Sequence, residues 1–288
     1  MIILAAVCWG IIGIFYRRLS ACGFTPIQIV FIRVGVAALV MTLYLLASDK
    51  DKLKIRWKDS LWFAGTGMCS LVFFNWCYFH AMDKSSLAVA AVLLYTAPVF
   101  VLFMSVLFFG ERLTFRKLAA LMVVFAGIMF VSGIFETGSA SLSFSGILFG
   151  LGSGFGYALY SILGTVLLKK YEPETVSVYT FIFAAAGSVL LAAAQPAPAQ
   201  AAKEPMVWVS ALGIGVVCSM LPFTFYTKGL TMVPASKAAV MATLEPVVAA
   251  LTGVIFFRES MDAGKLLGVL LILGGILLLG REQEKRKN

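Results

Sequence analysis

Glu245 and Arg33 are two ionisable side chains that lie inside long apolar stretches of this sequence, 235–257 and 26–47. An ionised carboxylate in apolar surroundings is costly unless it is paired, so such residues are usually functional or protonated. Glu245 could carry a coupling proton or bind a substrate amine, or it could cap helix ends broken at Pro246. Arg33 is always charged and could bind a substrate carboxylate or line an outer mouth, or it could contact helix-end carbonyl groups.

Aromatic and amide side chains accompany these two charges on other apolar segments, where they could line a binding cavity or serve as packing and interface anchors. His80, the only histidine, is interpreted as an interface residue. The predicted substrate cavity is lined by Trp9, Arg33, Asn75, Tyr78, Tyr95, Tyr157, Tyr160, Tyr179 and Glu245.

The composition indicates that helices in a membrane position these residues. Hydrophobic residues make up 61% of the 288 residues, charged residues make up 13%, and the mean hydropathy is +0.96. A soluble domain has roughly a quarter charged residues. The net charge of +9 comes from short Lys and Arg clusters between apolar runs, a pattern that is typical of membrane topology and not of nucleic-acid binding.

A spanning helix needs about 20 mostly apolar residues. By this measure the sequence predicts ten transmembrane helices, with the apolar start of the chain as the first span and not as a cleaved signal peptide. Their approximate ranges are 1–17, 26–47, 60–82, 86–109, 115–135, 144–168, 174–194, 206–228, 235–257 and 263–280. Sixteen of the 23 lysines and arginines fall on the side that holds both termini, six fall on the other side, and Arg33 lies between. This bias predicts that both termini are cytoplasmic. The expected location is a plasma membrane, such as a bacterial inner membrane.

An internal repeat appears when the sequence is shifted by 148 residues. Pro98-Val99 then aligns with Pro246-Val247, Glu111 with Glu259, and Trp9 with Tyr157. Between 79 and 132 there are 13 identities in 54 positions. Five spans per half is an odd number, so the second half enters the membrane the other way up. The sequence therefore predicts an all-α membrane fold of two inverted five-helix repeats, 1–137 and 143–288.

Inverted repeats are typical of secondary transporters, which place the solute site between the repeats near mid-membrane. Pro98 and Pro246 each remove a helix hydrogen bond, so they are predicted hinges. Gly146, Gly150 and Gly154 recur every four residues and favour close helix packing inside the molecule, or else a dimer face.

The paired pattern of a Pro-Val, a Phe-Phe-x-Glu, a Lys-Leu and a Gly resembles the EamA-type members of the drug/metabolite transporter superfamily. The segments that carry it run from Tyr95 to Arg112 and from Leu244 to Glu259. The resemblance covers essentially the whole chain, and it implies ten helices, a central cavity lined by both halves, and export or import of small metabolites. Members of the family usually have a cytoplasmic N-terminal segment that this sequence lacks, which is expected of a trimmed or misannotated start.

These features favour a secondary transporter that moves an amino acid or amine by alternating access, with the possibility of proton-coupled export. A channel or a flippase for lipid-linked solutes stays open as an alternative. Enzyme signatures such as HExxH, a Walker A loop or GxSxG are absent, and the sequence predicts no cofactor, no metal site and no nucleic-acid partner. The expected partners are a small-molecule solute and the lipid bilayer. Proton coupling stays an open alternative, and the oligomeric state is open between monomer and homodimer.

Overall fold

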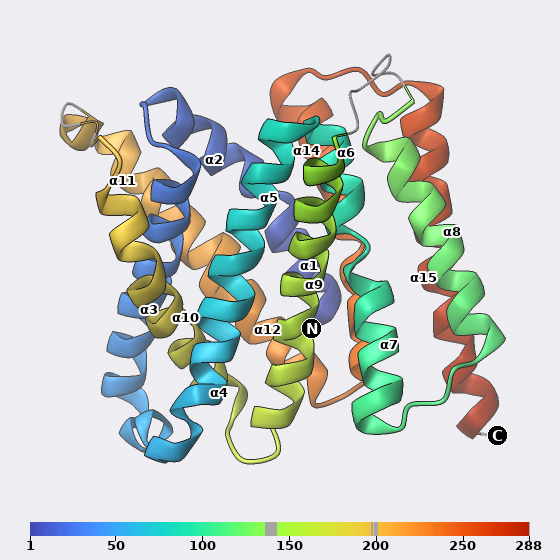
Figure 1. The fold of residues 1–288 in the computed structure, drawn as a ribbon, viewed down its shortest axis with the longest axis horizontal. Coiled ribbons are helices and arrows are strands. Elements are labelled where there is room, and N and C mark those ends of the chain that lie inside the picture. Colours follow the sequence, from blue (N-terminus) through green and yellow to red (C-terminus); the bar gives the residue numbers. More distant parts are fainter. Residues whose placement is uncertain (136–142, 197, 199–200, 288) are drawn as a thin grey trace.

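The chain forms an all-helical bundle in which successive segments run in opposite directions (Figure 1), as seen in a computed structural model that describes residues 1–135, 143–196, 198 and 201–287. The predicted boundary at 137 and the last residue, 288, lie outside these residues. The first half contains α1 (Ile2–Gly10), α2 (Ile12–Ala21), α3 (Pro26–Ser48), η1 (Lys50–Leu53), η2 (Trp57–Asp59), α4 (Ser60–Ala64), η3 (Gly65–Val72), α5 (Phe73–Lys84), α6 (Leu87–Leu94), α7 (Ala97–Phe109) and α8 (Phe115–Val131).

The second half repeats the order of the five crossings, with one continuous helix, α9 (Phe144–Leu167), in place of α1 and α2. It also contains α10 (Pro173–Ala193), η4 (Ala201–Lys203), α11 (Pro205–Leu212), η5 (Gly213–Met220), α12 (Leu221–Leu230), α13 (Ala235–Ala242), α14 (Glu245–Phe257) and α15 (Ala263–Lys287). We call the end of the bundle with the loops 49–59, 110–114, 168–172 and 231–234 the lower end, and the opposite end the upper end, as they lie in Figure 1.

Helices that follow one another without a loop combine into ten crossing segments within the described residues, which confirms the predicted ten-helix fold. Judged by length and composition alone, seven of these segments could span a membrane. Helix α15 adds a shorter apolar stretch, Ala263–Leu279. The segments 60–84 and 115–131 complete the alternation beside them (Figure 1).

The 148-residue shift relates irregular features of the two halves as well as their sequences. The fourth crossing breaks between α6 and α7 at Tyr95–Thr96, and the ninth breaks between α13 and α14 at Thr243–Leu244, which are the shifted positions. Each second part then starts with proline as its second residue, Pro98 or Pro246. Proline suits this place because the first turn of a helix leaves its N–H groups without helical partners anyway.

Both third crossings contain a π-helical segment at shifted positions, η3 and η5. Each segment has a glycine where it packs against a helix of the other half. A methyl group on Gly67 would lie 2.7 Å from the Thr180 carbonyl oxygen of α10, and one on Gly215 would lie 2.5 Å from the Val36 Cβ of α3. The third crossing of each half therefore packs against the second crossing of the other half, as inverted repeats require.

Glycines also hold α8 and α15 together as a separate pair at one side of the bundle (Figure 1). A methyl group on Gly127 would lie 2.7 Å from the Gly268 carbonyl oxygen, and one on Gly275 would lie 3.0 Å from the Ala120 carbonyl oxygen. Backbone approach of this kind gives van der Waals contact between helices that the apolar lipid cannot drive together.

Gly275→Ala is expected to destabilise the protein by about 1–3 kcal/mol, because the added methyl group meets the α8 backbone and forces the helices apart. The measurement is the thermal unfolding midpoint in detergent. Gly274→Ala on the same helix is the matched control, since a methyl group at Gly274 has no neighbour within 4 Å. Equal midpoints for the two variants would contradict this account of the α8–α15 packing.

Candidate functional site

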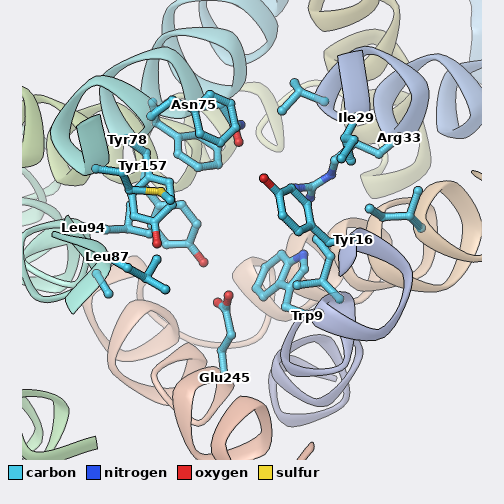
Figure 2. A pocket seen from close by; sticks show the side chains of 18 of the residues that line it. Trp9, Tyr16, Ile29, Arg33, Asn75, Tyr78, Leu87, Leu94, Tyr157 and Glu245 are labelled. Carbon is cyan, nitrogen blue, oxygen red and sulfur yellow. The ribbon is translucent and has the colours of Figure 1, made fainter. Parts of the chain in front are cut away.

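A cavity of about 400 Å³ lies between the two halves and is lined by residues from α1, α2, α3, α5, α6, α9, η5, α12 and α14 (Figure 2). A volume of this size is in the range of small-molecule binding sites. Seven of the nine residues predicted for the substrate cavity line it: Trp9, Arg33, Asn75, Tyr78, Tyr95, Tyr157 and Glu245.

Glu245 is the first residue of α14, directly after the break in the ninth crossing. Its carboxylate points into the cavity (Figure 2) and interacts with the hydroxyl groups of Tyr95 and Tyr157. The helix N-terminus adds free N–H groups and a favourable dipole for a negative charge at this point. Gly10 lets α1 approach this turn closely, because a methyl group there would lie 2.9 Å from the Glu245 carbonyl oxygen.

Arg33 projects from α3 on the opposite side of the cavity (Figure 2). Its Nε donates a hydrogen bond to Ser219 Oγ at 3.0 Å, and Ser219 in turn donates to the Ile214 carbonyl at 2.9 Å within η5. The second hydrogen bond joins residues that are five apart in the sequence, as the π-helical turn allows. Arg33 is thus oriented by the other half of the molecule, and its positive charge attracts the Glu245 carboxylate across the cavity.

Tyr16 lines the cavity although it is not among the residues predicted from the sequence. It lies beside Arg33 in Figure 2. The signal that could have identified it is the spacing Trp9, Ile12, Gly13, Tyr16, because residues at i, i+3, i+4 and i+7 share one helix face and all four line the cavity.

An aromatic cluster closes the cavity toward the lower end. Trp9 packs edge-on against Phe223, with ring centroids 5.3 Å apart, and Tyr160 packs against the same ring at 4.9 Å. Below them Tyr160 and Thr227 share a hydrogen bond of 2.5 Å, and Ser161 and Tyr226 share one of 2.7 Å. These side chains are nearly inaccessible to solvent, so we call the cluster the floor of the cavity.

The two remaining predicted residues, Tyr160 and Tyr179, therefore do not line this cavity. Tyr160 belongs to the floor. Tyr179 lies nearer the lower end, where its hydroxyl donates to the Leu53 carbonyl at 2.6 Å and its ring packs against Phe63. Both tyrosines use their hydroxyl groups within the protein, which leaves them outside the cavity wall.

At the upper end the cavity reaches exposed residues. Arg17 and Leu87 both line it and both are exposed, so the cavity opens in this direction. Arg17 pairs with Glu259, 2.5 Å away, and lies over the ring of Phe257. The molecule is therefore open at its upper end and closed at its lower end.

Other sequence predictions fall outside the cavity wall. His80 packs against Trp76 and Phe149. Gly150 and Gly154 contact Leu93 in α6, so the glycine pattern of α9 serves packing inside the molecule. Pro98 and Pro246 lie directly after the helix breaks, and their role as hinges stays a prediction. Within the described residues, no group of His, Cys, Asp or Glu side chains is arranged to hold a metal ion.

A family model and several related proteins all match this chain over most of its length. The model of the EamA-like transporter family matches residues 1–133 and again 144–281. An uncharacterized transporter of Archaeoglobus fulgidus is 30% identical over 98% of this chain and 95% of its own length. The uncharacterized transporter YxxF of Bacillus subtilis is 26% identical over 98% of this chain and 89% of its own length.

The uncharacterized inner membrane transporter YicL of Salmonella typhimurium is 24% identical over 99% of this chain and 95% of its own length. Among the solved structures that match is a crystal structure with a TM-score of 0.83 over 100% of this chain and 98% of its own. Its sequence is 19% identical, so the likeness shows the shared fold alone. The chain therefore belongs to the EamA-like transporter family, and it is a membrane transporter rather than an enzyme.

Proposed function

We propose that the protein is a secondary active transporter that carries a small amine or zwitterion, such as an amino acid, by alternating access. The observation that carries this proposal is the pair of opposite charges on facing walls of one cavity, Arg33 and Glu245. A zwitterion presents a carboxylate to the first and an ammonium group to the second. Trp9, Tyr16 and Tyr157 contribute the aromatic surfaces that suit a cation and its apolar side chain.

Proton coupling is expected because Glu245 could bind either a proton or the cationic group of the solute. A carboxylate deep in the membrane needs either a cation or a proton to be held there at low cost. In the proposed cycle Glu245 binds the ammonium group of the solute or a proton, and never both. Movement of one species in one direction then drives the other back, as in proton-coupled export.

Alternating access is supported by the floor of the cavity. A channel needs a continuous path, whereas the aromatic cluster around Trp9, Tyr160 and Phe223 closes the lower end while the upper end is open. The two halves, 1–137 and 143–288, are the proposed moving units, with Pro98 and Pro246 at the breaks where bending is easiest.

We further propose that the lower end faces the cytoplasm of a bacterial inner membrane, because the basic loops gather there. In intact cells, an impermeant thiol reagent is expected to modify a cysteine at Ala91, which lines the open cavity, in a chain whose own cysteines are replaced by alanine. A cysteine at Ser161, in the floor, is the unreactive control. If Ala91→Cys were labelled only from the cytoplasmic side, the proposed orientation would be wrong.

Glu245→Gln is expected to abolish the stimulation of solute uptake by a pH gradient. Total uptake is expected to fall roughly tenfold or more, because one charged interaction with the solute is lost. The measurement is uptake of pooled radiolabelled amino acids and amines into proteoliposomes, with and without an imposed pH gradient. Glu204→Gln is the control, since Glu204 is a half-exposed residue paired with Arg18 outside the cavity. Unchanged gradient-driven uptake by Glu245→Gln would remove this residue from the mechanism.

The same assay separates a zwitterion from a simple amine through Arg33→Gln. Arg33 faces Glu245 across the cavity, whereas the other lining arginine, Arg17, is paired with Glu259. The variant is therefore expected to lose uptake of amino acids and to retain uptake of amines that have no carboxylate. Equal loss of both classes would contradict the proposed contact between Arg33 and the solute carboxylate.

A further inference from the structure

Two helix seams related by the 148-residue shift are found in different states in this one structure. The lower seam lies between α13 and α7, and the upper seam lies between α6 and α14. In the lower seam Ala235 and Ala239 of α13 and Val101 of α7 are buried, with at most 5% of each side chain exposed. The lower seam is therefore closed.

The upper seam is more exposed at the counterparts of these three residues, although Ala88 beside them stays buried. Leu87, the counterpart of Ala235, is 62% exposed, and Ala249, the counterpart of Val101, is exposed as well. A cleft of about 280 Å³ lies along this seam and is lined by Ala88, Ala91 and Pro246 among others. Ala91 also lines the central cavity, so closing this seam would cover the solute.

A polar contact crosses the closed lower seam. Glu111 follows α7 and accepts a hydrogen bond from Ser236 of α13, as well as one of 2.8 Å from Lys117 Nζ. Only 11% of the Glu111 side chain is exposed. Burial acts to raise the pKa of Glu111, but the hydrogen bonds from Lys117 and Ser236 outweigh it and lower the pKa, so the carboxylate stays ionised and the contact is charge-assisted.

The upper seam cannot form this contact with its own residues. The counterparts of Glu111 and Lys117 are Glu259 and Lys265, but the counterpart of Ser236 is Ala88, which has no hydroxyl group. Glu259 instead pairs with Arg17 on α2. The counterpart of Arg17 is Thr165, an uncharged residue. The cation Lys169 lies over the ring of Phe109, the counterpart of Phe257, but the ion pair that Glu111 forms is with Lys117.

We infer that Ser236 and Glu111 are positioning residues that make the upper-open form the resting state of the transporter, and that Ala88 and Arg17 weaken the opposite closure. This inference rests on the proposed alternating access. Closing the upper seam requires the Arg17–Glu259 pair to separate, and only apolar contacts form in its place. Opening the lower seam breaks the charge-assisted hydrogen bond between Ser236 and Glu111. Both differences favour the form described here.

Two cysteine reporters measure the balance without any knowledge of the solute. Ala91→Cys lines the open cavity, and its counterpart Ala239→Cys is buried in the closed lower seam. Each is placed in the chain with its five cysteines replaced by alanine, and the rate of reaction with a small thiol reagent is measured on the intact protein. Because Ala239→Cys reacts only when the lower seam opens, its rate follows the population of the alternate form.

Ser236→Ala is expected to raise the Ala239→Cys rate roughly tenfold, the factor for loss of one hydrogen bond to a charged group. Ala88→Ser is expected to raise it in the same direction, because it gives Glu259 the hydroxyl partner that the upper seam lacks. The rate at Ala91→Cys should not rise in either variant. In a Glu259→Gln background the effect of Ala88→Ser should disappear, while the effect of Ser236→Ala should persist.

An increase at both reporters would indicate general loosening and would overturn the inference, as would an unchanged Ala239→Cys rate in both variants. Persistence of the Ala88→Ser effect in the Glu259→Gln background would also overturn it. The outcome is separate from the test of Glu245, because the labelling rates do not depend on solute or proton binding. Failure here with a positive transport result would leave the proposed function intact.

Discussion

An odd number of crossings in each half is the constraint on which the rest of the structure depends. After five crossings the chain lies at the end of the bundle opposite to the one where it began. The second copy of the same sequence pattern must therefore be inverted. Packing that the repeat encodes therefore recurs, once toward each end, where the two copies keep equivalent residues in equivalent contacts. This relation holds for the helix breaks in the fourth and ninth crossings, for the π-helical segments and for the glycine contacts at Gly67 and Gly215. It does not hold for the break at Ile11 between α1 and α2, because α9 is continuous at the shifted position.

Function begins where the two copies differ. The scaffold positions are alike, but Glu245 corresponds to Ala97, Arg33 to Phe181 and Asn75 to Phe223. These substitutions give the single central cavity a charged and polar lining that neither half repeats. The same principle applies to the ends of the bundle, where Ser236 corresponds to Ala88. A symmetric scaffold thus holds an asymmetric site and an asymmetric pair of closures.

Much of this architecture could be predicted from the sequence because a bilayer imposes simple rules on length and composition. The ten crossings, their inversion and seven of the nine cavity residues follow from hydropathy and from the repeat. Tyr160 and Tyr179 are placed elsewhere because a tyrosine on a membrane helix can turn its hydroxyl toward another helix or a loop carbonyl, and hydropathy does not distinguish these cases.

The irregular parts of the backbone were harder to predict. No residue pattern marks the π-helical segments, which bring Ser219 to Arg33. The exact helix breaks also depend on tertiary packing, since Tyr95 and Thr243 end helices there without being helix breakers themselves. Nor could the sequence indicate which end is open, because an inverted repeat is compatible with both forms.

The most direct test of the account is the coupling between the two ends. Spin labels at Lys84 and Ser260 span the upper end, and labels at their counterparts Met232 and Arg112 span the lower end. Distance distributions measured by pulsed electron–electron double resonance, with and without transported solute, should shift in opposite directions for the two pairs. For each pair of labels, the less populated distance should match the more populated distance of the other pair. Distances that stay fixed, or that lengthen at both ends together, would contradict a carrier built from two inverted and reciprocally closing halves.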